Sequence, residues 1–260
     1  MLKELSTTDY GLIGHPLGHS FSKSFFTELF AREKSGETYD NFDLPELTPE
    51  ALYSLVLMNP NLKGFNVTSP YKQAIIPFLD SLSPEAERIG AVNTVKIIRD
   101  DTGMVRRLEG YNTDVEGFRS SVATMAASLA PGRGAIILGT GGASKAVAEA
   151  LRQLGVPSLF VSRSKKGEDT VSYSDIDPTV IADYPLIINA TPAGTFPDVD
   201  LMPPFPTQLL GPWTMVHDLV YNPAQTKLMR LAAQKGATVK NGLEMLHAQA
   251  LASLNIWKQQ

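Results

Sequence analysis

A glycine-rich turn between two apolar patterns constrains the fold of this chain more than any other feature. The run AIILG (135–139) is typical of a buried strand, and GGASKAVAEALRQLG (141–155) is typical of a helix. Glycine lets the backbone turn sharply and approach a phosphate, and a helix N-terminus offers unpaired N–H groups to an anion. The pattern predicts a βαβ unit whose turn holds the pyrophosphate of a dinucleotide. The turn residues are Gly139, Thr140, Gly141, Gly142 and Ala143.

A tight turn without a ligand is the alternative, because Ser144 stands where the full dinucleotide fingerprint has a third glycine. The next strand, SLFVSR (158–163), favours the cofactor. NAD-binding folds place a carboxylate near the end of this strand, whereas an arginine suits the 2′-phosphate of NADP. This chain has no acidic residue there before Glu168, so the sequence predicts NADP. The predicted 2′-phosphate residues are Ser162, Arg163, Ser164 and Lys165.

Strands alternate with helices along the whole chain, which predicts an α/β fold in two domains with largely parallel sheets. Thr113 and Glu116 have the spacing of a capping box at the start of a helix. Between 164 and 186 the chain has room for only a brief helix. The expected strands cover 10–14, 38–44, 62–68, 135–139, 158–163, 186–192 and 214–221, with a hairpin around Asp101 and Gly103. The expected helices cover 21–36, 47–60, 113–129, 141–155, 226–236 and 241–259.

Composition excludes several classes of protein. A formal net charge of -4 over 260 residues argues against a sequence-independent grip on nucleic acid. The absence of cysteine excludes disulfides, thiolate metal sites and cysteine nucleophiles, and the four histidines lack a metal-ligand spacing. The N-terminal stretch lacks a long apolar core and a cleavage signal, so we expect no export segment, and no apolar run approaches the roughly 20 residues of a membrane span. We therefore expect a cytoplasmic protein without a metal, a nucleic-acid partner or a membrane span; composition leaves open whether it is a monomer or a homodimer.

Four polar stretches follow or end predicted strands in the first half of the chain. Sites collect at the carboxyl ends of parallel strands, so we expect these side chains to meet at one oxygen-rich ligand. Each also has a structural alternative, such as capping a helix or occupying a turn. The stretches are GHPLGHSFSKS (14–24), GFNVTSPYK (64–72), GAVNTV (90–95) and GYNTD (110–114), and the candidates are Ser20, Ser22, Thr68, Asn93 and Asp114.

Lys72 occupies an unusual place for a cation. Ser69 can cap a helix and Pro70 suits its first position, which puts Lys72 in the first turn. The positive end of the helix dipole disfavours a charged lysine there.

The motifs HSFS, NVTSPYK, GAVNT and NTD, followed by GTGGAS, INATPAG and LEMLHAQA, resemble the shikimate dehydrogenase family over nearly the whole chain. The resemblance implies a shikimate-binding domain at 1–112 plus 240–260 and an NADP-binding Rossmann domain at 113–239. It implies reversible, NADPH-dependent reduction of 3-dehydroshikimate to shikimate, a step in aromatic amino acid (chorismate) biosynthesis.

The resemblance also implies residue roles. Lys72 and Asp114 form the catalytic pair: the lysine ammonium protonates the developing alkoxide, and the neutral amine takes the proton back. The helix start favours the neutral amine and Asp114 favours the charged form. Ser20 and Ser22 contact the substrate carboxylate. The ring-hydroxyl residues are Thr68, Asn93, Asp114 and Gln249, with Tyr221 also near the substrate, and Leu219 and Gly242 lie beside the nicotinamide.

Among the departures from the family pattern, two fall in the predicted site. Lys23 stands where the family usually has proline, and Ser162-Arg163-Ser164 replaces Asn-Arg-Thr. Three alternatives remain: a relative that also oxidises quinate or uses NAD, a catalytically silent ligand sensor, and a folate dehydrogenase of similar architecture. The presence of Lys72 and Asp114 argues against the sensor, and the HSxS and NTD stretches argue against the folate enzyme.

Overall fold

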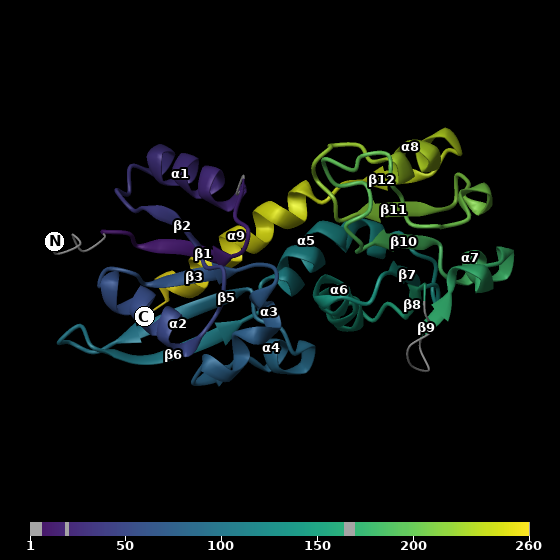
Figure 1. Cartoon of the computed structure of the whole chain (residues 1–260). Helices are drawn as coiled ribbons and strands as arrows, with labels where there is room; N and C mark the ends of the chain where they lie inside the picture. Colours follow the sequence, from purple (N-terminus) through teal and green to yellow (C-terminus); the bar gives the residue numbers. More distant parts are fainter. Residues whose placement is uncertain (1–6, 19–20, 164–169, 260) are drawn as a thin grey trace. The chain divides into compact units, whose positions relative to one another are not determined.

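The computed structural model describes residues 7–18, 21–163 and 170–259. The chain forms two compact units, Met1–Thr113 with Ala250–Gln260, and Asp114–Gln249. Each unit is built around its own β-sheet, and the α/β fold class predicted from the sequence is confirmed (Figure 1). The units differ from the predicted domains mainly at 240–249, which group with the second unit. The binding roles assigned to the domains remain predictions.

The sheet of the first unit is largely parallel, as predicted. Across its described strands the order is β2-β1-β3-β5-β6-β4, and β5 runs opposite to its neighbours. A tight hairpin reverses the chain between β5 and β6: the Asp100 carboxylate accepts the N–H groups of Thr102 and Met104, and Gly103 has a φ of 83°. The strands are β1 (Tyr10–Gly14), β2 (Tyr39–Asp43), β3 (Gly64–Val67), β4 (Ser81–Leu82), β5 (Thr94–Arg99) and β6 (Val105–Tyr111).

Helices cover both faces of this sheet. Tyr10 and Leu12 of β1 point to a core shared with α1 and the C-terminal part of α9, whereas Ile13 points to a core shared with α2, because side chains alternate along a strand. Gly64 permits the approach of α9, since a Cβ there would lie 2.3 Å from the Trp257 ring. The helices are α1 (Phe21–Glu33), α2 (Pro49–Met58), α3 (Tyr71–Ala74), α4 (Pro84–Ile89) and α9 (Leu243–Lys258), with a 3₁₀ turn η1 (Ile76–Phe78).

The start of α3 differs from the prediction. Pro70 is the N-cap, no side chain caps the helix, and Ser69 therefore does not have the capping role expected of it. The reason is that the chain still follows β1 at this point: Thr68 donates its N–H to Ile13 O at 2.9 Å, and Ser69 O accepts from the His15 N–H at 3.2 Å. The helix can begin only at Tyr71. Lys72 is its second residue and stays in the first turn, as predicted.

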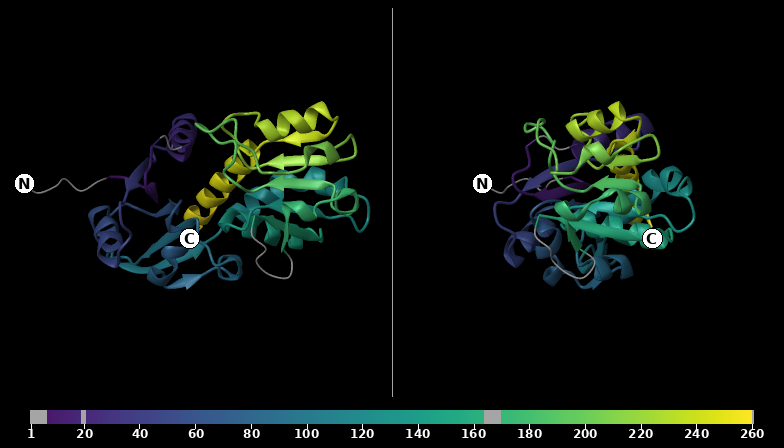
Figure 2. Two further views of the ribbon diagram at one scale, coloured as in Figure 1. Left: turned by 45° about the vertical axis from the view of Figure 1, so that its right-hand side comes forward. Right: turned by 90° about the vertical axis from the view of Figure 1, so that its right-hand side faces the viewer.

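The second sheet is parallel throughout its described strands, in the order β12-β11-β10-β7-β8-β9 (Figure 2). Counted from β7, this is the 3-2-1-4-5-6 order of a Rossmann fold. The order reverses between β7 and β10, which is where such sheets bind ligands. The strands are β7 (Ala135–Leu138), β8 (Ser158–Ser162), β9 (Thr170–Ser172), β10 (Leu186–Asn189), β11 (Met215–Asp218) and β12 (Thr238–Lys240).

Helices also cover both faces of the second sheet. Ile181 of α7 and Leu228 of α8 pack with Ile136 on one face, and Phe118 of α5 stacks on His217 of β11 on the other. The brief helix expected between 164 and 186 is confirmed as α7, whereas β9 and β12 were not predicted. The helices are α5 (Asp114–Ala127), α6 (Gly142–Gln153), α7 (Pro178–Asp183) and α8 (Lys227–Gln234), with 3₁₀ turns η2 (Tyr173–Asp175) and η3 (Thr207–Leu209).

The predicted capping box at the start of α5 is wrong. Thr113 directs both its N–H and its hydroxyl to Asn93 Oδ1, at 2.7 and 3.1 Å. The Glu116 carboxylate instead accepts from Arg119 and Ser120 one turn later. A stronger buried partner for Thr113 therefore replaces the local cap. Within the described residues, none of the helices combines the length and apolar character needed to cross a membrane.

Candidate active site

The ends of three neighbouring strands meet in the first unit. Leu44, just after β2, donates its N–H to Gly14 O at 3.1 Å, and the β1 and β3 ends are joined through His15 and Ser69. A Cβ on Gly14 would lie 2.4 Å from Thr68 Cγ2, so glycine is required for this approach. The structure thus brings Thr68 beside the loop that leads to the predicted carboxylate serines. Ser22 is half-buried at the start of α1, and Ser20 lies outside the described residues.

The same loop is fastened to β2 by contacts that the sequence did not predict. His15 Nδ1 lies 2.6 Å from Asp43 Oδ1, and the Leu17 N–H donates to Asp43 Oδ2 at 3.2 Å. These two hydrogen bonds hold the pKa of the Asp43 carboxyl below its usual value. Lys23, which replaces the usual proline, pairs with Asp40 at 2.6 Å. Two carboxylates of β2 therefore bind residues on either side of the predicted serines.

Asn93 is buried with 3% of its surface exposed and lies in a polar network. Its Oδ1 accepts from the Thr94 hydroxyl at 3.0 Å and from both the N–H and the hydroxyl of Thr113. Asn66 of β3 and Ser253 of α9 complete this network. Asn66 stands out in the sequence as a polar residue within a buried strand, but nothing local indicates Ser253, which lies 187 residues from Asn66.

Lys72 is half-buried and its short helix is fixed on two sides. Its carbonyl accepts from the Val92 N–H at 2.7 Å, which places α3 against the GAVNT stretch. The neighbouring Tyr71 hydroxyl donates to Leu44 O at 2.6 Å. Lys72 thus belongs to the same set of strand ends as Thr68 and Asn93.

Asp114 and Gln249 belong to the second unit. Asp114 is the first residue of α5, 8% exposed, where the helix dipole favours a carboxylate. A Cβ on Gly117 would lie 2.8 Å from Gln249 Cβ, so α5 and α9 pack closely there. Residues three apart share a helix face, so this contact places Gln249 against the face that carries Asp114. Lys72 and Asp114 fall in different units, and their pairing stays a prediction.

The glycine turn fits a pyrophosphate. Gly139 has a φ of 102°, a conformation that favours glycine, and a Cβ there would lie 3.0 Å from Thr191 Cγ2. Gly141 caps α6 without a side-chain hydrogen bond, and a Cβ on Gly141 or Gly142 would meet nothing within 4 Å. Among the described residues, nothing therefore crowds the glycines at the start of α6, where the first N–H groups lack partners within the helix. Ser144, in the third-glycine position, is fully buried and small enough for the strand-helix contact.

The end of β8 fits a 2′-phosphate. Ser162 is its last residue and Arg163 follows it, exposed. Burial raises the pKa of the Tyr173 phenol, and the positive charge of Arg163 offsets part of that rise, so the guanidinium lies near η2. Ser164 and Lys165 lie outside the described residues.

The predicted nicotinamide residues contact each other. A Cβ on Gly242 would lie 2.0 Å from Leu219 O, so only glycine permits this approach. The Leu219 N–H donates to Asn189 O at 2.9 Å, which fixes the loop after β11 to the end of β10. Tyr221 follows in the same loop, 39% exposed, with its pKa raised by partial burial. These residues lie near the point where the strand order reverses.

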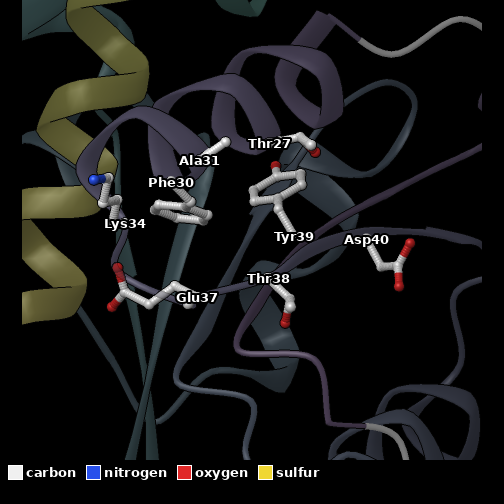
Figure 3. A pocket seen from close by; sticks show the side chains of 9 residues that line it. Thr27, Phe30, Ala31, Lys34, Glu37, Thr38, Tyr39 and Asp40 are labelled. Atoms are coloured by element: carbon white, nitrogen blue, oxygen red, sulfur yellow. The ribbon is translucent and has the colours of Figure 1, made fainter.

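Two surface hollows lie away from the predicted site. One, of about 590 Å³, is formed by α1 and the chain leading into β2, where Lys34, Glu37 and Tyr39 border it (Figure 3). Another, of about 520 Å³, lies among α2, η1 and β6. Neither lining contains a predicted site residue, so we assign neither hollow a role.

A parallel sheet in Rossmann order, with an open glycine turn at its first strand-helix junction, defines a dinucleotide-binding α/β protein. The model of the shikimate dehydrogenase substrate binding domain matches residues 12–95. A shikimate dehydrogenase (NADP(+)) of Desulforamulus reducens is 36% identical over 265 residues, covering 95% of this chain and 88% of the relative. That of Chlorobaculum tepidum is 38% identical, covering 96% and 90%.

Solved structures agree with these matches. Shikimate 5-dehydrogenase from Thermus thermophilus, in complex with NADP(H) and shikimate, superposes with a TM-score of 0.81 at 32% identity, over 96% of this chain and 93% of that one. Quinate dehydrogenase from Corynebacterium glutamicum, in complex with NAD, superposes with a TM-score of 0.83 at 28% identity, over 97% and 94%. The chain belongs to the shikimate dehydrogenase family.

Proposed function

We propose that this protein is an NADP-dependent shikimate dehydrogenase that reversibly reduces 3-dehydroshikimate to shikimate. The observation that carries the proposal is the match over nearly the full length of relatives with this activity. Both halves of the required chemistry are present in the chain: polar strand ends with a half-buried lysine in the first unit, and an open glycine turn with Arg163 in the second.

The proposed substrate contacts follow from the polarity of the groups. Ser20 and Ser22 bind the carboxylate as hydroxyl donors. Thr68, Asn93, Asp114 and Gln249 bind ring hydroxyls, and Tyr221 contributes near the ring. Burial of Asn93 among fixed donors supports this role, because an amide that cannot rotate discriminates between hydroxyl positions.

Proton transfer is assigned to Lys72. NADPH, when bound, supplies the hydride that converts the ketone to the alcohol. The Lys72 ammonium donates the proton that the developing alkoxide needs, and in the oxidative direction the neutral amine accepts it. Asp114 favours the charged lysine and the start of α3 favours the neutral one, so the two influences oppose each other.

The glycine turn, residues 139 to 143, holds the pyrophosphate of the cofactor at the start of α6. Ser162, Arg163, Ser164 and Lys165 bind the 2′-phosphate, and Leu219 and Gly242 lie beside the nicotinamide. The support is the open helix start and the exposed guanidinium at the end of β8. The absence of cysteine is consistent with work in the cytoplasm, where we place the protein.

Use of quinate as well as shikimate is the second candidate, because quinate dehydrogenase is among the structural neighbours. The test is the loss of NADPH absorbance with 3-dehydroshikimate, run beside NADH and beside 3-dehydroquinate. If absorbance is lost only with NADPH and 3-dehydroshikimate, the result supports an enzyme specific for shikimate and NADP. Comparable rates with NADH or 3-dehydroquinate support the broader one. A folded protein that binds NADPH and reduces neither ketone contradicts both and indicates a ligand sensor.

A further inference from the structure

A network of buried hydrogen bonds connects β2, β3 and α9 to Asn93. The Tyr39 hydroxyl donates to Asn66 Oδ1 at 2.9 Å, and Asn66 Nδ2 donates to Ser253 Oγ at 2.9 Å and to Thr94 Oγ1 at 3.2 Å. Ser253 Oγ lies 2.8 Å from Thr94 Oγ1. Each of these side chains is at most 6% exposed, and Thr94 and Ser253 are fully buried.

Two backbone groups fix the orientation of the Asn66 and Asn93 side-chain amides in this network. The Thr113 N–H can only donate, so the Asn93 atom 2.7 Å from it must be the carbonyl oxygen. The Asn93 backbone carbonyl can only accept, so the Asn66 atom 3.2 Å from it must be the NH₂ group. The assignment of oxygen and nitrogen in each side chain therefore follows from chemistry.

Asn93 Oδ1 cannot donate, so the two threonine hydroxyls beside it act as donors. Thr94 and Thr113 each donate their single hydroxyl hydrogen to Asn93 Oδ1, at 3.0 and 3.1 Å. Toward other groups, both hydroxyls can then only accept. Ser253 Oγ lies 2.8 Å from Thr94 Oγ1 and 3.1 Å from Thr113 Oγ1, its single hydrogen can go to one of them at a time, and Asn66 Nδ2 also donates to Thr94 at 3.2 Å. Ser253 itself accepts from Asn66. Asn66 thus donates to both Ser253 and Thr94, Ser253 contacts both threonine hydroxyls, and the threonines donate to Asn93.

We propose that Ser253 is a positioning residue for substrate recognition, because its hydroxyl contacts both threonines that donate to Asn93 Oδ1 and holds them in place. With three donors on that oxygen, Asn93 acts on a ring hydroxyl as an N–H donor through Nδ2. This inference rests on the proposed function, in which Asn93 binds a ring hydroxyl of shikimate. The Tyr39 end of this network lies near the predicted site, since Ser22 lowers the pKa of the Tyr39 phenol against the larger effect of burial, which raises it.

The test is steady-state kinetics of Ser253→Ala in the full chain, with shikimate and NADP⁺ varied separately. Loss of one buried hydrogen bond that orients a ligand group corresponds to about a tenfold change in affinity. We expect the KM for shikimate to rise about tenfold, with kcat and the KM for NADP⁺ little changed. Ser121→Ala is the matched control: Ser121 is equally buried, but its hydroxyl donates to Phe118 O within α5.

A double mutant separates positioning from general loss of stability. In an Asn93→Ala background, Ser253→Ala should raise the KM for shikimate little further, because the group it positions is gone. An unchanged KM in the single variant, or fully additive effects in the double variant, overturns the inference. If Ser253→Ala does not fold, Ser253→Cys keeps a weak donor in the same place and should raise the KM in the same direction, and an unchanged KM there overturns the inference as well.

The wild-type protein distinguishes this inference from the proposed function. If wild type turns over shikimate and Ser253→Ala matches it, only the positioning role fails. If folded wild type neither binds nor oxidises shikimate, the proposed function fails and the positioning role fails with it.

Discussion

The buried His217 makes a specific prediction about acid stability. Its side chain is fully buried in β11, and its ring stacks on Phe118 with centroids 5.3 Å apart and 18° between the planes. The backbone of Asn241 approaches the ring without a hydrogen bond of normal geometry. Burial, and then the positive charge of Lys240, lower the pKa of His217 to about 3. The folded protein therefore holds this imidazole neutral where an unfolded chain would protonate it.

The magnitude follows from linkage. The folded-state pKa of about 3 lies below the ordinary value of 6.5, so the contribution to stability is complete above pH 6.5 and is lost as the pH falls toward 3. Each pH unit in that window costs about 1.4 kcal/mol. The free energy of unfolding should therefore fall by about 2 kcal/mol between about pH 8 and pH 5 from this residue alone.

The assay is urea unfolding of wild type, His217→Phe and His217→Gln across this pH range. Neither variant titrates at this position. The difference in free energy of unfolding between wild type and each variant should therefore change by about 2 kcal/mol between about pH 8 and pH 5, equivalent to about 4–8 °C in Tm. Phe118→Leu disturbs the same stack without changing a titrating group and should lower stability by the same amount at each pH. Parallel pH curves for wild type and both His217 variants would refute the reasoning.

Two further predictions concern binding. Asp43→Asn weakens the acceptor for His15 and the Leu17 N–H, so the KM for shikimate should rise while the KM for NADP⁺ stays unchanged in steady-state kinetics; an equal change in both constants would contradict a local role in the loop. Arg163→Ala removes the proposed partner of the 2′-phosphate, so affinity for NADPH, measured by fluorescence titration, should fall about 10- to 100-fold while affinity for NADH changes little. Equal losses for the two cofactors would remove Arg163 from that role.

Periodicity and glycine placement were sufficient to predict the α/β class and the strands and helices that frame the cofactor turn. These features are local: β7, Gly139 and α6 are contiguous, and a strand followed by glycine and a helix has few folded arrangements. The hairpin at Asp101 and Gly103 was also predictable because its turn chemistry is local.

The remaining errors and omissions come from contacts between distant segments. Thr113 had a good local partner in Glu116, yet a buried asparagine 20 residues away takes its hydrogen bonds. Ser69 had the right type for a cap, but strand-end pairing delays the start of α3. Ser253 and Asn66 meet only because the C-terminal helix returns to the first unit. No local pattern encodes such a return.

The proposed reduction of 3-dehydroshikimate depends most directly on Lys72 as the proton donor. The measurement is NADPH-dependent reduction of 3-dehydroshikimate by Lys72→Met, with NADPH affinity measured by titration on the same sample. Methionine keeps the length of the side chain and removes the transferable proton. Turnover should fall about 10²- to 10⁴-fold while NADPH affinity stays within about twofold of wild type. Turnover near the wild-type rate, with NADPH still bound, would contradict this role of Lys72.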